Sequence, residues 1–227
     1  MKIEKVRLET HNIDKLKGFY EKLPGIIKLD DEGSFSVGSS ILEVADAQGE
    51  IHGNYHIAFE VHKGHLLALY EQLQAELTFI TRDETVIFDI KNWNSKAVYF
   101  FDSDMNILEF IERDYAEENE RPIRSIVEVG LALRNMKEME CLKLNTELDI
   151  FPGIVSEQFM PIGDEDGLFI CVPKGRNWNP SIRASGFTPT TVIFEVNGKK
   201  KQLTYLNNGD INIEYLKNES NGKELVI

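Results

Sequence analysis

The chain has 227 residues, of which 42% are hydrophobic and 10% aromatic, so it is long and apolar enough to form one or two packed domains. Its 38 acidic and 25 basic side chains give a formal net charge of −13, which argues against a nucleic-acid partner. The sequence has no apolar run long enough to span a membrane and no signal peptide. Two isolated cysteines, Cys141 and Cys171, favour a reducing compartment. We therefore expect a cytoplasmic protein with no membrane or nucleic-acid partner.

The first 45 residues predict a β-α-β-β-β unit. Apolar and charged residues alternate over 5–10, which is typical of a strand with one buried face. Asn12 can cap a helix that Pro24 and Gly25 end. Three short strands are predicted after the helix, over 26–29, 34–37 and 40–45.

The same order returns over the next 60 residues. A strand at 56–61 is followed by a helix with apolar residues at helical spacing between Leu66 and Leu77. Four strand-like runs follow, over 77–81, 86–91, 97–101 and 107–111. Residues 1–113 therefore read as two tandem βαβββ modules that form one domain.

A charged segment, 114–121, is the predicted linker to a second, related domain over 122–227. Its first strand is expected to carry Val127, Val129, Leu131 and Leu133 on one face, and a capping box at Asn135 and Glu138 begins its helix. The last module has no room for a helix. It is predicted to be a truncated β-meander over 191–196, 202–206 and 211–216.

Three stretches resemble the vicinal oxygen chelate superfamily, which includes glyoxalase I, the fosfomycin- and bleomycin-resistance proteins and the extradiol dioxygenases. They are NIDKLKGFYEKLPGI (12–26), HIAFEV (56–61) and AVYFFDSDMNILEFIER (97–113). The third is the most specific, because a DSDMN turn and an ILEF strand occur together. The resemblance is clear in the first domain and weak in the second.

The resemblance implies an α+β fold in which paired βαβββ modules form curled, cup-shaped mixed sheets, with metal ligands on the first and last strand of each module. The matching positions of the first domain are Lys5, Glu43, His56 and Glu109. Glu43, His56 and Glu109 are competent ligands for Mn²⁺, Fe²⁺, Ni²⁺ or Zn²⁺. Lys5 is not, because an ammonium group has no free lone pair.

The matching positions of the second domain are poorer in ligands, since they hold Glu128, Ile170, Thr191 and Glu214. We therefore interpret the second domain as a degenerate copy. Ring cleavage of the extradiol dioxygenase type is disfavoured, because it needs two histidines at the iron and only His56 falls at a matching position.

Strand alternation offers a test that does not depend on the resemblance. If the apolar sides of the strands face the helices, the opposite sides carry four carboxylates, two cations and one histidine. An antiparallel sheet often shows such a side to water, and the resemblance favours a ligand-binding cup instead. The residues expected on this side are Lys5, Arg7, Glu9, Ile41, Glu43, Ala45, His56, Ala58, Glu60, Ile107, Glu109 and Ile111.

Three functional hypotheses remain open, and the sequence does not decide whether the protein is an enzyme. In the first, the metal ligands Glu43, His56 and Glu109 serve a lyase or isomerase of the glyoxalase type. There Glu109 or Glu43 moves a proton, while Lys5, Arg7 and Glu60 contact a small oxygen-chelating substrate. In the second, Lys5 replaces the metal and the protein is a small-molecule binder of the bleomycin-resistance type. There Trp93, Phe35 and Phe100 could line the cup, although core packing explains each of them more simply. In the third, the protein is a scaffold whose cup has lost its chemistry. The chain could be a monomer or a homodimer.

Overall fold

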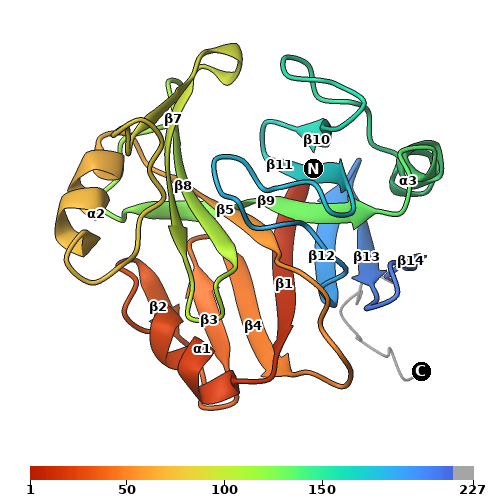
Figure 1. The fold of residues 1–227 in the computed structure, drawn as a ribbon, viewed down its shortest axis with the longest axis horizontal. Helices are drawn as coiled ribbons and strands as arrows, with labels where there is room; N and C mark the ends of the chain where they lie inside the picture. The colour runs from red at the N-terminus through yellow and green to blue at the C-terminus, as the bar shows by residue number, and fades with distance from the viewer. Residues whose placement is uncertain (217–227) are drawn as a thin grey trace, which may run out of the picture.

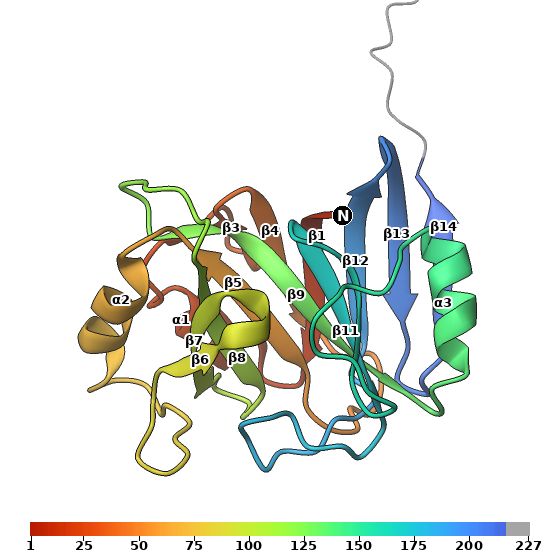
Figure 2. The same cartoon turned by 90° about the horizontal axis from the view of Figure 1, so that it is seen from above.

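The computed structural model describes residues 1–216, which form two seven-stranded mixed sheets and three α-helices (Figures 1 and 2). The first, here the β1 sheet, has the order β14-β13-β12-β1-β4-β3-β2. Its strands are β1 (Lys2–Thr10), β2 (Ile26–Lys28), β3 (Ser34–Val37), β4 (Ser40–Asp46), β12 (Thr190–Val196), β13 (Lys199–Tyr205) and β14 (Ile211–Tyr215).

The second sheet, here the β5 sheet, has the order β10-β11-β9-β5-β8-β7-β6. Its strands are β5 (His56–Val61), β6 (Phe88–Ile90), β7 (Ser95–Phe101), β8 (Ile107–Arg113), β9 (Ile123–Leu133), β10 (Met160–Asp164) and β11 (Gly167–Pro173). The helices are α1 (Ile13–Tyr20), α2 (His65–Leu73) and α3 (Glu138–Thr146), with a short 3₁₀ helix, η1 (Lys91–Trp93), before β7. Figure 1 shows α1 and α2 on the side of the molecule opposite α3.

The predicted α+β class, the curled mixed sheets and the truncated last module are confirmed. In each of the first two modules the first strand lies parallel to the last, as β1 does to β4 and β5 to β8. The last module is the antiparallel meander β12-β13-β14. Asn197 and Gly198 both have positive φ in its first turn, as a tight hairpin requires.

The modules pair differently from the prediction, because neighbouring modules of one half do not share a sheet. Strand β1 pairs antiparallel with β12, and β5 pairs antiparallel with β9. The predicted halves, 1–113 and 122–227, therefore each contribute strands to both sheets. Residues 114–121 connect β8 to β9 without a helix or strand, and residues 217–227 lie outside the described part of the chain.

The predicted strand at 77–81 is not formed. Its only sheet-like contact is an isolated bridge between Phe79 and Phe100. The expected capping box also differs, because α3 begins at Glu138, two residues later than an N-cap at Asn135 would place it. The side chain of Asn135 accepts a hydrogen bond from the amide of Lys137, and no side chain caps the helix itself.

The main core lies between the two sheets and the helices. Val6 and Leu8 of β1 belong to the same buried cluster as Ile57 and Phe59 of β5, so the predicted apolar faces of these strands are confirmed. A second, smaller apolar cluster, with Ala58 at its centre, covers the other face of the β5 sheet. No helix among residues 1–216 combines the length and the apolar character that a bilayer crossing requires.

Candidate metal centre on the β5 sheet

Three ionisable side chains converge on the inner face of the β5 sheet, around Ala58. Strand β8 places Glu109 opposite Ala58 on one side, and β9 places Glu128 opposite it on the other. His56 lies two residues before Ala58 on β5 and therefore projects from the same face. The small methyl group of Ala58 leaves the space above the strand open to the two carboxylates.

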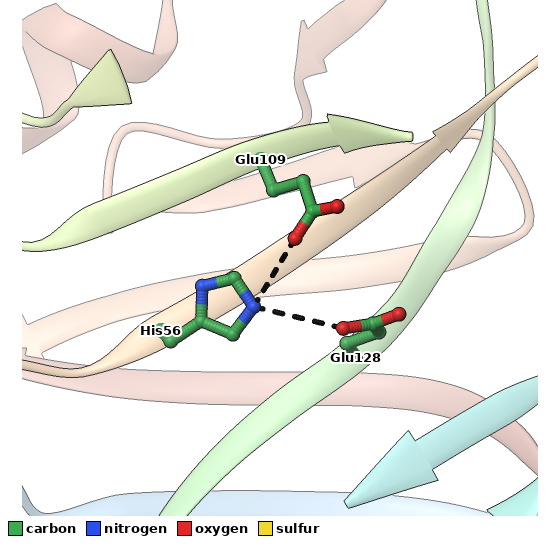
Figure 3. A group of neighbouring side chains, drawn as sticks. All are labelled: His56, Glu109 and Glu128. Atoms are coloured by element: carbon green, nitrogen blue, oxygen red, sulfur yellow. Dashed lines mark ion pairs between the residues drawn. The ribbon is translucent and has the colours of Figure 1, made fainter. Parts of the chain in front are cut away.

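The three side chains point toward one another (Figure 3). His56 Nε2 lies 3.4 Å from Glu109 Oε2 and 3.6 Å from Glu128 Oε2. All three are buried, with exposed side-chain fractions of 7%, 3% and 3%. Water therefore does little to screen the charges of this cluster.

A β-bulge aims Glu128 at the cluster. The pairing of β5 with β9 shifts by one residue between Ala58–Glu128 and Phe59–Ile126, which leaves Val127 as the extra residue. Val127 consequently packs in the small cluster on the inner face, whereas Val129 and Leu131 pack in the main core. The predicted common face of these three residues is thus interrupted at Val127, as a bulge that redirects neighbouring side chains explains.

Burial and neighbouring charges both shift the pKa values of His56 and Glu109. Burial alone would lower the pKa of His56, but Glu109 and Glu128 outweigh that effect and raise it to about 9. Burial, and then the charge of Glu128, raise the pKa of Glu109 above its ordinary value. Without a bound ion, a protonated His56 and the guanidinium of Arg113 supply the positive charge beside the two carboxylates.

The donor set suits a divalent metal ion. One imidazole and two carboxylates bind Zn²⁺, Mn²⁺, Fe²⁺ or Ni²⁺, and the ligand atoms all lie within 4.8 Å of one another. Donors about 2.1 Å from a tetrahedral ion are about 3.4 Å apart, close to the two measured separations. Glu128 Oε1 is buried with no hydrogen-bond partner among the described residues. An ion would displace the proton of His56 and bind Nε2 together with Oε2 of Glu109 and Oε2 of Glu128, which face it.

A buried ion-pair network supports Glu128 from behind. Arg113 Nη2 lies 3.8 Å from Glu128 Oε1, and Arg113 Nη1 lies 3.6 Å from Glu60 Oε1. Arg124 also contacts Glu60. Glu60, an expected substrate contact, is fully buried in these ion pairs, so it does not face the cavity.

The cluster forms the base of a cavity of about 230 Å³. The strands supply its floor, and two segments, 154–159 and 176–179, lie over it. Its lining includes Trp93, Tyr99, Phe159, Ile170, Arg176 and Trp178. Trp93 therefore faces a cavity, contrary to the simpler explanation from the sequence.

The structure places the remaining predicted site residues on the β1 sheet. Lys5 forms an ion pair with Glu43, and Arg7 Nε lies 3.5 Å from the other oxygen of Glu43. They line a pocket of about 200 Å³ together with Thr191, Ile193 and Gln202. Of the expected ligands, His56 and Glu109 thus come together, and Glu43 lies on the other sheet with the two cations.

Glu128 is the candidate ligand that the sequence did not bring to this site, although it stands at a matching position of the third module. The carboxylate at that position could be seen in the sequence, but the first module was expected to pair with the second. In the structure the second module pairs with the third, through β5 and β9. Ile170, at the matching position on the last strand of the third module, also lines the cavity and offers no ligand atom. Glu214 lies on the outermost strand, β14, and accepts a hydrogen bond from Gln202. The strand that pairs with β12 is β13, which carries Gln202. Gln202 therefore occupies the position that was predicted for Glu214.

Comparison with known proteins relates the chain to others through its fold. No family model matches the sequence, and no curated protein matches it significantly. A candidate dioxygenase from Bacillus subtilis subsp. subtilis str. 168 has a TM-score of 0.56 and 14% identity, covering 95% of this chain and 84% of that one. The V278E mutant of glyoxalase I from Zea mays has a TM-score of 0.54 and 11% identity, covering 94% of this chain and 92% of that one.

Both alignments span nearly the whole of this chain, so the likeness includes both sheets. At such identities the likeness concerns the fold and not the chemistry. The chain thus shares the fold of these two proteins, which is the vicinal oxygen chelate fold that the resemblance implied.

Proposed function

We propose that the protein binds one divalent metal ion on His56, Glu109 and Glu128, and acts as a lyase or isomerase on a small molecule with two neighbouring oxygens. The observation that carries the proposal is the convergence of these three buried donor groups at the base of a cavity. Three buried ionisable groups without a bound ion would be costly to maintain, and such clusters are typical of functional sites.

A bound ion would act as a Lewis acid that polarises a substrate carbonyl. Glu109 is the residue best placed to accept a proton from the carbon next to that carbonyl. It lines the cavity beside His56, and its carboxylate oxygens can take up that proton. Tyr99 lies opposite Glu109 on the neighbouring strand β7 and lines the same cavity.

The aromatic lining would keep water away from the reacting atoms. Trp178 packs against the His56 ring, with the ring centroids 5.5 Å apart and the planes at 33°. Tyr99 lies on another side of His56, at 6.4 Å. The imidazole is therefore held between two aromatic rings, which fixes the direction of Nε2 toward the two carboxylates.

Metal analysis tests the proposal. The purified chain would be stripped with a chelator, incubated with Mn²⁺, Fe²⁺, Ni²⁺ or Zn²⁺ in turn, and assayed for bound metal after gel filtration. We expect about one ion per chain for at least one metal, and loss of that ion in both His56→Ala and Glu109→Gln. Failure of all four ions to bind stoichiometrically would overturn it.

The metal-free alternative has one observation in its favour, namely the cation-filled pocket of the β1 sheet. Lys5 and Arg7 already neutralise Glu43 there, as expected of a cup in which an ammonium group replaces a metal. If that cup is the functional one, ligand binding depends on Lys5 and is unchanged by His56→Ala. The two variants Lys5→Gln and His56→Ala therefore separate the alternatives.

A further inference from the structure

The cavity over the metal centre has flat aromatic walls. Trp93 of η1 and Phe159 lie with their ring centroids 6.0 Å apart and their planes at 38°. Trp178 forms another wall beside His56, and its indole nitrogen donates a 2.7 Å hydrogen bond to the carbonyl oxygen of Asn54. Rings fixed in this way favour a flat, unsaturated ligand, because it can stack without the rings having to move.

Gly130 on β9 is what allows Trp178 to lie so close to the strand. A Cβ at this position would come within 2.6 Å of Trp178 Cη2 and 3.0 Å of His56 Cβ. Contacts that short do not occur between ordinary side chains, so any larger residue would displace the indole. The wall thus depends on a particular residue of the strand that also carries Glu128.

Arg176 is the cation of the cavity lining that has no acidic partner. It is partly buried, its guanidinium lies 5.4 Å from the centre of the Phe159 ring, and Nη1 donates to the carbonyl oxygen of Asn177 at 3.2 Å. Among residues 1–216, every ion pair found involves other side chains. Burial lowers the pKa of Arg176, as expected for a charge with no opposite charge nearby.

In the metal-loaded cavity, the positive charge of Arg176 would have no matching negative charge. A divalent ion would balance Glu109 and Glu128, and a ligating His56 is neutral. Farther along the same strands, Glu60 and Asp166 balance Arg113 and Arg124. The loaded cavity therefore carries one unmatched positive charge, on a planar group suited to two parallel hydrogen bonds with a carboxylate or phosphate.

From these walls and this charge we propose that the substrate is an aromatic anion: a flat ring attached to a group with two neighbouring oxygens for the metal, and a separate carboxylate or similar group for Arg176. This inference deepens the proposed function and rests on it. Phe159 holds the guanidinium by stacking, so Arg176 is a specificity-determining residue.

Three inert chelators of increasing size test the proposal by calorimetric titration of the metal-loaded protein. Acetohydroxamate supplies only two oxygens, benzohydroxamate adds a ring, and 3- or 4-carboxybenzohydroxamate adds an anion. We expect each addition to tighten binding, with about tenfold from the carboxylate. Arg176→Gln should remove that last gain and leave benzohydroxamate binding unchanged, and Arg183→Gln, outside the cavity lining, serves as the matched control.

The outcomes separate this inference from the metal proposal. If acetohydroxamate binds but the ring and the carboxylate add nothing, the inference is overturned while the metal site stands. A carboxylate gain that survives in Arg176→Gln also overturns it. If acetohydroxamate fails to bind, yet the carboxylated probe binds and depends on Arg176, the proposed chelation of two substrate oxygens by the metal fails and the anion site is supported. If no probe binds, both are overturned.

Discussion

The two sheets repeat one arrangement of strands and differ in what stands at its centre. On the β5 sheet, Ala58 lies opposite both Glu109 and Glu128. On the β1 sheet, the residue opposite both Glu43 and Thr191 is Arg7. A methyl group leaves room for an ion between two carboxylates, whereas a guanidinium fills that room and brings its own positive charge.

The residue two positions earlier on the central strand of each sheet differs in a similar way: one is a possible metal ligand and the other is a cation. His56 lies two residues before Ala58, and Lys5 lies two residues before Arg7. Lys5 and Arg7 have side chains that are 35% and 44% exposed, whereas the His56 cluster is almost fully buried. The same arrangement of strands therefore carries a buried set of candidate metal ligands on the β5 sheet and a partly exposed ion pair on the β1 sheet.

Segments outside the strands explain the difference in burial. The pocket at Lys5 is lined by strand residues alone. The cavity at His56 is lined also by Ile154, Phe159, Arg176 and Trp178, which lie outside helices and strands. The connections after α3 and after β11 thus close one cup and leave the other open.

The largest expected effect is on stability, when the buried Arg113 of the β5 sheet is compared with the more exposed Arg7 of the β1 sheet. Replacing Arg113 by Ala leaves Glu60 and Glu128 short of a partner in a buried setting, and we expect a loss of about 3–5 kcal/mol in the free energy of unfolding. The matched change, Arg7→Ala, should cost less than about 1 kcal/mol because its ion pair is exposed to water. Urea denaturation of both variants measures the difference, and equal losses would contradict the comparison.

A transplant of the buried arrangement onto the open sheet should give a smaller, positive effect. The variant Lys5→His/Arg7→Ala/Thr191→Glu copies the residues at the three corresponding positions. We expect it to bind a second ion per chain, about 10–100-fold more weakly than the natural site, because the supporting network of Arg113 has no counterpart there. The control is Arg7→Ala alone, which should bind no second ion; identical metal content in the control and the triple variant would contradict the account.

The smallest effect is expected from a carboxylate that lysines hold at the edge of the β1 sheet. Tyr215, Lys201 and Lys199 lower the pKa of Glu147 from 4.5 to about 2. Because the folded state lowers this pKa, the stabilisation is present above pH 4.5 and is lost as the pH falls toward 2. The difference in unfolding free energy between the natural chain and Glu147→Gln should therefore shrink over this range. A difference that does not change with pH would show that Glu147 is not held by these groups.

Local patterns were sufficient to predict most of the fold. The alternation in β1, β5 and β8 identified the inner faces correctly, because side chains along a strand alternate between the two faces. It failed at Val127, where an extra residue shifts the register. A bulge leaves little trace in the sequence, since it depends on how one strand meets its neighbour.

The candidate site was only partly predictable for a related reason. His56 and Glu109 belong to one module, and the sequence order of that module brings them together. Glu128 comes from the next module, and which modules share a sheet is decided by long-range packing that periodicity does not report. Trp178 and Arg176 lie on a connection whose course follows no repeating pattern, so no local signal could identify them.

The most direct test of the account compares Glu128→Gln with Glu43→Gln in calorimetric titrations of the stripped protein with Zn²⁺ and Mn²⁺. Both changes remove one carboxylate charge from a matching position of the same fold, on different sheets. The account predicts that Glu128→Gln weakens metal binding by about 100-fold or more, because even supporting residues of metal sites contribute 10–100-fold, and that Glu43→Gln leaves it unchanged. Loss of binding in Glu43→Gln with full binding in Glu128→Gln would contradict it.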